Sequence, residues 1–458
     1  MALSEAFLQK LREILDPGRV STGDSNLSLH AKDESFHAPH KPDVVVWPES
    51  TEEVSRIVRL CYEEEIPVTP WGAGTSLEGN PIPVKGGVVI DLQQMNKILN
   101  IREDDLQVDV QAGVVFKDLN KKLARYGLFF PPDPGASATI GGMVANNASG
   151  IRAIKYGATK DLIQKLTVVL ADGEIIHPGT LAFKTSSGLD LCRLFAGSEG
   201  ILGIVTEITL RLVGIPPEFL SATVSFPGTE SATLTISQII RSGLAPAALE
   251  LLGTNCVRLV NKYTEEFNFP ETPLVFIEFH GTNKEGRAID LELVKGLCED
   301  NGASNFQAGI GRQARAKLWQ ARYDLHDFIL REHPGLEPMA IDTAVPISKL
   351  PDLVAYAEEI TREKDIIGYV FGHAGSGNIH MPMMGNPEDK ESWSVLEEIN
   401  HKLVEYAISL GGTATGEHGV GIGKMQFMEL EHGKSLEIMR RIKKLLDPKG
   451  ILNPGKMF

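Results

Sequence analysis

Three histidines and a glutamate lie in two glycine-rich segments of the C-terminal half. The segment Gly-His-Ala-Gly-Ser-Gly-Asn-Ile-His contains His373 and His380, and the segment Gly-Glu-His-Gly contains Glu417 and His418. The first two histidines are not spaced as neighbours on a helix face, so we expect them in adjacent strands or loops that converge. Two neutral imidazoles and a carboxylate suit Zn, Mn or Fe(II), which leaves His418 to act as a base. A lone histidine is more often structural, but this combination favours a metal site formed by His373, His380 and Glu417.

Three further segments are rich in small residues and could hold a ligand against the backbone. They span residues 70–79, 131–150 and 197–206. Glycines let backbone N–H groups approach an anion, and Thr75 and Ser76 add hydroxyl donors. The glycine spacing in the first segment does not match the dinucleotide-binding fingerprint. Taken separately, these segments are also compatible with ordinary turns or tightly packed joins between a loop and a helix.

Arg322, in the sequence Trp-Gln-Ala-Arg, is a candidate ligand for a substrate carboxylate. A guanidinium binds a carboxylate through two parallel hydrogen bonds. An arginine on an amphipathic helix is normally solvated, so this assignment depends on the rest of the site.

The composition disfavours several classes of function. The chain has 458 residues, of which 42% are hydrophobic and 23% charged, and this predicts two or three folded domains. A formal net charge of -15 disfavours nucleic acid and anionic lipid as partners. We see no transmembrane segment, secretory signal or import presequence, and we expect a cytoplasmic protein. The four cysteines are too scattered for an iron–sulfur cluster or zinc ribbon held by this chain alone.

Short strands and helices alternate irregularly around these segments, which favours an α+β fold. After a helix that ends near Leu15, residues 21–41 show no periodicity, and a capping box at Ser50 and Glu53 predicts the start of a second helix. From about Pro216 onward, strand-like and helical patterns repeat. This order is typical of a ferredoxin-like sheet with helices on one face.

Together and in this order, these segments resemble one family, the FAD-linked oxidases of the vanillyl-alcohol oxidase and p-cresol methylhydroxylase type. The similar branch contains D-lactate, D-2-hydroxyglutarate and glycolate dehydrogenases, and the resemblance extends from about Lys41 to Phe458. It implies an α+β fold with a two-subdomain FAD-binding domain and a ferredoxin-like cap domain for the substrate. The implied boundaries are an N-terminal lead-in (1–40), the FAD-binding domain (41–213), the cap domain (216–440) and a C-terminal segment that returns to the FAD domain (441–458).

The resemblance also implies roles for individual residues. The implied FAD-binding residues are Pro70, Gly72, Ala73, Gly74, Thr75, Ser76, Gly79, Pro134, Gly135, Thr139, Gly141, Gly142, Asn146, Ala148, Ser149, Gly150, Glu199, Gly200, Gly203, Ile204, Val205 and Asn453. Because residues 70–79 contain no histidine, we expect non-covalent FAD. By the same resemblance, His373, His380 and Glu417 bind a divalent metal, usually zinc, His418 is the base and Arg322 binds the substrate carboxylate.

The implied reaction is the oxidation of a small D-2-hydroxy acid, D-lactate to pyruvate in particular, by hydride transfer to the flavin. Residues 341–351 look most like D-lactate dehydrogenases, and Ala340 stands where hydroxyglutarate enzymes carry a lysine, which disfavours a diacid. The alternatives are a glycolate oxidase catalytic subunit and a D-2-hydroxyglutarate dehydrogenase. A zinc hydrolase and a non-catalytic subunit that merely holds FAD are alternatives of a different class.

The electrons must pass to a separate acceptor, since we expect no cluster in this chain. An electron-transferring flavoprotein, a quinone, a cytochrome and an iron–sulfur subunit are all compatible with the sequence. Any membrane association would then be peripheral and mediated by a partner.

Overall fold

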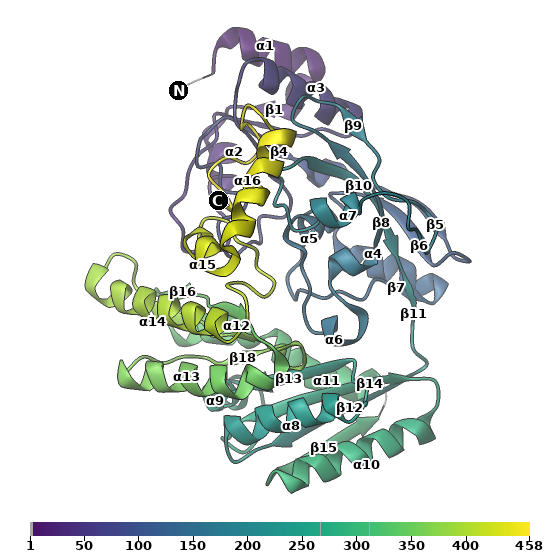
Figure 1. Ribbon diagram of the computed structural model, residues 1–458, viewed down its shortest axis with the longest axis vertical. Coiled ribbons are helices and arrows are strands. Elements are labelled where there is room, and N and C mark those ends of the chain that lie inside the picture. The colour runs from purple at the N-terminus through teal and green to yellow at the C-terminus, as the bar shows by residue number, and fades with distance from the viewer. Residues whose placement is uncertain (1–2, 266, 311) are drawn as a thin grey trace. The chain divides into compact units, whose positions relative to one another are not determined.

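The computed structural model describes residues 3–265, 267–310 and 312–458. The chain forms two compact units (Figure 1). The first unit comprises residues 1–149, 157–215 and 417–458, and the second comprises residues 150–156 and 216–416. The second unit thus ends at Gly416, whereas the sequence placed the end of the cap domain near residue 440.

The first unit contains two larger sheets. Its main helices and strands are α1 (Glu5–Ile14), β1 (Val20–Ser21), α2 (Asp24–Leu29), β2 (Val44–Val46), α3 (Thr51–Glu63), β3 (Val68–Trp71), β4 (Val88–Asp91), β5 (Ile98–Arg102), β6 (Gln107–Gln111), α4 (Phe116–Leu123), β7 (Leu128–Phe129), α5 (Ile140–Asn146), β8 (Ile163–Val169), β9 (Ile175–Ile176), α7 (Leu191–Phe195), β10 (Ile204–Arg211), β11 (Val213–Gly214), α15 (Met428–His432) and α16 (Lys434–Leu446). One sheet has the order β1-β2-β4-β3, with β2, β4 and β3 parallel. The other has the order β5-β6-β10-β8-β9 and is antiparallel throughout.

Local sequence explains where these elements begin. The Ser50 hydroxyl accepts a hydrogen bond from the Glu53 amide at 3.2 Å, so α3 starts at Thr51, as the capping box predicts. β2 and β4 are buried along their whole length, which explains their uninterrupted apolar sequences. The stretch 21–41 differs from expectation, because it contains the short helix α2.

The second unit is built on one seven-stranded sheet. Its main elements are α6 (Ala153–Tyr156), β12 (Glu218–Ser225), α8 (Thr229–Arg241), β13 (Ala248–Leu252), α9 (Thr254–Tyr263), β14 (Leu274–Gly281), α10 (Lys284–Asp300), β15 (Ser304–Ile310), α11 (Arg312–Tyr323), α12 (Leu325–Glu332), β16 (Glu337–Met339), β17 (Asp342–Ala344), α13 (Leu350–Glu363), β18 (Phe371–Gly372), β19 (Asn378–His380), β20 (Met383–Gly385) and α14 (Lys390–Ser409). The sheet order is β15-β12-β14-β13-β18-β19-β17. Its first four strands follow the fourth-first-third-second order of a ferredoxin-like fold.

Helices cover both faces of this sheet, which corrects the expectation of one covered face. Helices α8, α10 and α13 lie on one side (Figure 1). On the other side, α9, α11 and α12 pack against β13 and β14 in an apolar cluster that includes Trp319, Phe276 and Ile329. The extra layer follows from α9, which is inserted between β13 and β14, and from the α11–α12 pair after β15.

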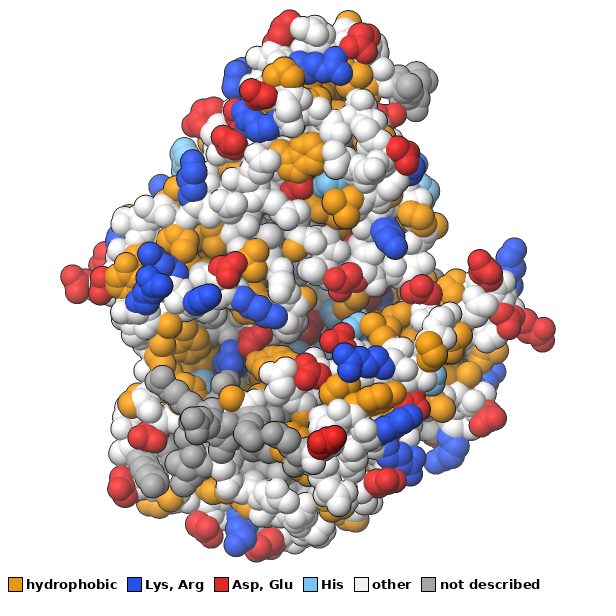
Figure 2. Space-filling model, turned by 180° about the vertical axis from the view of Figure 1, so that it is seen from behind, with side chains coloured by type: hydrophobic (Ala, Val, Ile, Leu, Met, Phe, Trp, Pro, Cys, Tyr) orange, Lys and Arg blue, Asp and Glu red, His pale blue; other side chains and the backbone are white. Residues whose placement is uncertain are grey.

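The surface in Figure 2 carries acidic and basic side chains interspersed with one another. Within the described part of the chain, no helix is both long and apolar enough to span a bilayer.

Candidate active site

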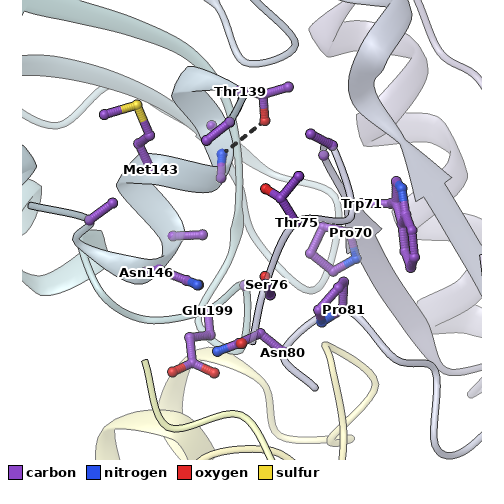
Figure 3. Close-up of a pocket in the computed structure, with 18 of the residues that line it drawn as sticks. Pro70, Trp71, Thr75, Ser76, Asn80, Pro81, Thr139, Met143, Asn146 and Glu199 are labelled. Atoms are coloured by element: carbon purple, nitrogen blue, oxygen red, sulfur yellow. Dashed lines mark hydrogen bonds between the residues drawn. The ribbon is translucent and has the colours of Figure 1, made fainter. Parts of the chain in front are cut away.

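The first unit contains a cavity between loops that are far apart in the sequence (Figure 3). It is lined by residues of the segments 70–81, 134–148, 195–205 and 417–418, together with Asn453. These ranges cover most of each of the three small-residue segments singled out in the sequence. Around the space in Figure 3 lie the hydroxyls of Thr75 and Ser76 and the amide of Asn146.

The glycines of these segments are required by close packing between the loops. A Cβ atom at Gly72 would lie 2.5 Å from the Thr139 hydroxyl, and one at Gly200 would lie 2.5 Å from the Pro70 ring. Gly200 also has a φ of +75°, a backbone conformation that residues with a side chain rarely adopt. Small residues therefore bring the cavity walls together.

Backbone hydrogen bonds connect the second and third segments. The amides of Gly197 and Glu199 donate to the carbonyls of Val144 and Ala145, at 2.9 Å each. The Thr139 hydroxyl caps α5 by accepting from the Gly142 amide at 3.3 Å, as drawn in Figure 3. These bonds fix the end of α5 against the turn that leads into β10.

Glu199 anchors the segment that follows the second unit in the chain. Its carboxylate accepts hydrogen bonds from the amides of Val420 at 2.6 Å and Gly421 at 2.9 Å. Burial raises the pKa of Glu199, and these amide donors partly oppose that effect. Nearby, the carbonyl of His418 accepts from the Asn146 amide at 3.1 Å, and Glu417 accepts from the Ser149 hydroxyl at 3.0 Å. Glu417 and His418 are thus held in the cavity wall.

The C-terminal turn closes the base of the same region. The Asn453 side-chain amide donates to the carbonyls of Glu199 at 2.7 Å and Asn80 at 3.1 Å. The Lys456 ammonium donates to the Ile82 carbonyl, and burial lowers the pKa of Lys456 to about 8. Asn453 therefore links two of the loops that line the cavity.

Most residues that the sequence assigned to the cofactor lie in this cavity wall. They are Pro70, Gly72, Ala73, Gly74, Thr75, Ser76, Pro134, Thr139, Gly141, Gly142, Asn146, Ala148, Glu199, Gly200, Gly203, Ile204, Val205 and Asn453. Four others, Gly79, Gly135, Ser149 and Gly150, lie outside the wall. The Gly79 amide donates to the Asp33 carboxylate at 2.9 Å.

Sequence reasoning missed several wall residues. Asn80, Pro81, Leu92, Ala112 and Phe195 lie outside the three segments, whereas Trp71, Leu77 and Ser198 lie within them but were not assigned individually. Asn80 and Pro81 directly follow the first segment, so extending it by two residues would have included them. Trp71 and Phe195 carry ordinary core signals and could not have been separated from the core by sequence alone.

In the second unit, two of the predicted metal ligands lie close together. His373 follows β18, His380 ends β19, and Phe371 pairs with His380 across the two strands. The ring centroids of His373 and His380 are 5.1 Å apart, and both side chains are buried. The expected convergence of the two histidines thus arises from one tight turn between adjacent strands.

Buried carboxylates face both imidazoles. Nδ1 of His373 lies 2.8 Å from Oε1 of Glu250, and Nδ1 of His380 lies 3.5 Å from Oδ1 of Asp342. Asp342 is itself held by the Asn378 amide at 2.7 Å and the Thr415 hydroxyl at 2.9 Å. No sequence motif pointed to Glu250, and the segment 341–351 that contains Asp342 was singled out only for its resemblance to D-lactate dehydrogenases.

Arg322 is not solvated. It is 8% exposed, and its Nε and Nη2 lie 3.0 Å and 2.9 Å from Oε2 of Glu250. Its guanidinium also lies over the Phe371 ring, 4.7 Å from the centroid. Arg322, His373 and His380 belong to the second unit, whereas Glu417 and His418 belong to the first.

Two family models match most of the chain. The FAD binding domain model matches residues 42–179, and the model of the FAD linked oxidases, C-terminal domain, matches residues 215–457. The chain belongs to the FAD-linked oxidases. It is 38% identical to a mitochondrial D-lactate dehydrogenase [cytochrome] of Arabidopsis thaliana, over 99% of this chain and 80% of that protein.

Other relatives extend the comparison. A probable mitochondrial D-lactate dehydrogenase of Danio rerio is 37% identical over 100% of this chain and 92% of its own length. The glycolate oxidase subunit GlcD of Bacillus subtilis is 35% identical over 98% of this chain and 96% of its own length. The chain is thus an FAD-linked oxidoreductase.

Solved structures show the same fold at low sequence identity. A 4-ethylphenol oxidase from Gulosibacter chungangensis matches with a TM-score of 0.81 and 19% identity, over 100% of this chain and 98% of that one. A p-cresol methylhydroxylase matches with a TM-score of 0.80 and 18% identity, over 99% and 96%. The fold is therefore the p-cresol methylhydroxylase type expected from the sequence.

Proposed function

We propose that this protein oxidises D-lactate to pyruvate with FAD as its electron acceptor. The observation that carries the proposal is similarity over nearly the full chain to proteins named D-lactate dehydrogenases, at 37% and 38% identity. Ala340 supports a small substrate, because it supplies no cation for a second carboxylate.

We propose that FAD binds non-covalently in the cavity of the first unit. Its described wall contains hydroxyls, amides and glycine backbone, and it includes no lysine or arginine. We infer that the loop at 70–79 binds the pyrophosphate through backbone N–H groups and the hydroxyls of Thr75 and Ser76. The apolar and glycine-rich remainder suits a flat ring system. When bound, FAD supplies the two-electron acceptor for the hydrogen on C2 of the substrate.

His418 is proposed as the base that takes the proton of the 2-hydroxyl. It lies in the cavity wall, and its backbone is fixed by Asn146. Arg322 is proposed to bind the substrate carboxylate and so to orient C2. Its pair with Glu250 keeps the guanidinium in one orientation.

A divalent cation is proposed at His373 and His380, with Glu417 as the third ligand, as the family resemblance implies. The donor chemistry fits, because each imidazole faces a buried carboxylate through Nδ1, an arrangement common around metal-binding histidines. The cation would lower the pKa of the substrate hydroxyl and make the proton easier for His418 to remove. Zinc is the ion we expect.

Glycolate is the second candidate substrate, and the similarity to GlcD of Bacillus subtilis favours it. Glycolate lacks the methyl group of D-lactate but carries the same carboxylate and hydroxyl. The two candidates are separated by comparing kcat/KM for both acids with one electron acceptor dye. In either case the reduced flavin needs a separate acceptor, which we propose to be a protein or a quinone.

The role of His418 is tested by His418→Ala. This variant should still bind FAD, because the bonds from Asn146 and Glu199 to the backbone of residues 418–421 do not involve the substituted side chain. Reduction of the flavin by D-lactate should slow at least about a hundredfold, as expected for loss of a general base. Stopped-flow absorbance under anaerobic conditions measures this rate. Reduction at the wild-type rate would show that His418 is not the base.

A further inference from the structure

Glu250 is a fully buried carboxylate of the second unit that contacts both Arg322 and His373. It lies in β13 and is 0% exposed. Its two oxygens have different partners. Oε2 accepts from Nε of Arg322 at 3.0 Å and lies 2.9 Å from Nη2, while Oε1 lies 2.8 Å from Nδ1 of His373.

The contact with His373 determines which ring nitrogen carries a proton. An ionised carboxylate only accepts hydrogen bonds, so Nδ1 of His373 must donate to Glu250. The lone pair of the neutral ring is then on Nε2, which is the nitrogen that a cation would bind. Glu250 thereby selects the tautomer and fixes the ring orientation.

The contact with Arg322 fixes the guanidinium in the same way. Two of its nitrogens face Oε2 of Glu250, and its plane lies against Phe371. A buried cation of this kind needs a partner charge, because desolvation would otherwise be costly.

We propose that Glu250 is a positioning residue that prepares the cation ligand His373 and the substrate ligand Arg322 together. The inference rests on the proposed function, because it assigns Glu250 to groups that the proposal places in the site. The same carboxylate contacts both Arg322 and His373, so a single substitution of Glu250 must disturb at least one of the two contacts.

An amide at this position cannot serve both partners. The carboxylate offers two acceptors, but glutamine offers one acceptor and one donor of the same shape. If the amide oxygen faces Arg322, the NH2 group faces His373 and favours the tautomer with the proton on Nε2. Glu250→Gln should therefore weaken cation binding, since the guanidinium is the stronger partner for the remaining oxygen.

The test measures Zn²⁺ affinity on FAD-loaded protein, by competition with a chromophoric chelator. Glu250→Gln should bind Zn²⁺ about tenfold to a hundredfold more weakly than wild type, as for other partners of metal-binding histidines. The matched control is Glu278→Gln, which alters a carboxylate in the adjacent strand that is equally buried and lies 2.6 Å from His280. The control should bind Zn²⁺ like wild type.

A double variant separates positioning from general damage. Arg322→Met combined with Glu250→Gln removes both buried charges and lets the amide oxygen turn to His373. Zn²⁺ affinity should then recover toward wild type, while D-lactate binding is lost together with the guanidinium. Flavin content and absorbance verify folding of each variant.

Two outcomes would overturn the inference. If Glu250→Gln binds Zn²⁺ with wild-type affinity while His373→Ala loses Zn²⁺ binding, the role of Glu250 is rejected and the proposed cation site stands. Zn²⁺ binding that His373→Ala leaves unchanged would reject the cation site of the proposed function, and this role of Glu250 with it.

Discussion

At the scale of single residues, the interior of the first unit holds charges that burial disfavours. Lys456 is 3% exposed, and burial lowers its pKa to about 8, although the carboxylates of Glu199 and Asp33 act in the opposite direction. The unfolded chain would bind the same proton with the ordinary lysine pKa near 10.5. Folding therefore releases this proton between about pH 8 and pH 10.5.

This difference predicts a pH dependence of stability. Because the unfolded state binds more protons in that window, the contribution of Lys456 to stability rises as the pH rises. The free energy of unfolding of wild type, relative to Lys456→Met, should increase by about 2 kcal/mol from pH 7.5 to pH 9.5. Urea titrations of both proteins at the two pH values measure it. A constant difference would contradict the altered pKa.

The chemical role of individual residues could be predicted from the sequence where several reactive side chains lie in one short motif. His373 and His380 lie in one glycine-rich segment, and their types alone suggested a metal site. Glu250 gave no such signal, because a single glutamate in Ala-Leu-Glu-Leu-Leu is typical of an exposed strand position. Its partners are 72 and 123 residues away, and only the folded sheet brings them together.

At the scale of elements, the turn between β18 and β19 sets the positions of both histidines. Gly377 in this turn has a φ of +75°, and a Cβ atom there would lie 2.1 Å from the Val345 carbonyl. Gly335 has a similar φ of +84° with open space around it. The two glycines have similar φ angles and differ mainly in how closely other atoms approach the position of a Cβ atom.

Substituting alanine at each glycine should separate crowding from backbone strain. Gly335→Ala should lower the free energy of unfolding by about 1–2 kcal/mol, the cost of a left-handed residue. Gly377→Ala should lose more, because the carbonyl of a neighbouring segment must also move. Urea denaturation monitored by circular dichroism gives both values. Equal losses would show that the turn tolerates a side chain.

The C-terminal turn is the second element that positions the site. Asn453 holds the loops at Asn80 and Glu199 through two hydrogen bonds. Asn453→Ala leaves two buried carbonyls without this donor, which costs about 1–3 kcal/mol. We expect FAD to bind about tenfold or more weakly, measured by the fluorescence of released flavin.

Asn301→Ala is the control for this loss. The Asn301 side chain makes comparable bonds in the second unit, to Gln238 at 2.7 Å and to the Leu297 carbonyl at 2.8 Å. FAD affinity should stay at the wild-type value in this control. If both variants bind FAD equally well, Asn453 does not order the cofactor loops.

Most elements were predictable from periodicity and capping. The capping box at Ser50 and Glu53 is a local signal, and it predicted the start of α3 correctly. The helices on the second face of the large sheet were not predicted. Their placement depends on burial of Trp319 and Ile329 against β13 and β14, which no local pattern specifies.

At the scale of the whole molecule, the chain leaves the first unit and returns to it. The return begins at Glu417, earlier than the sequence suggested. The reason is the Glu199 carboxylate, which binds the amides of Val420 and Gly421 from more than 200 residues away. The glycine-rich sequence of this segment predicts a loop, but it does not indicate which unit the loop packs against.

The central claim is that bound FAD is reduced by a D-2-hydroxy acid, D-lactate in particular. An anaerobic absorbance spectrum of the purified protein before and after D-lactate tests this most directly, with L-lactate and glycolate in parallel. The account predicts loss of the oxidised flavin band with D-lactate, no loss with L-lactate, and inhibition by a chelator. A protein that shows no flavin band after reconstitution with FAD, or one that L-lactate reduces equally well, would contradict it.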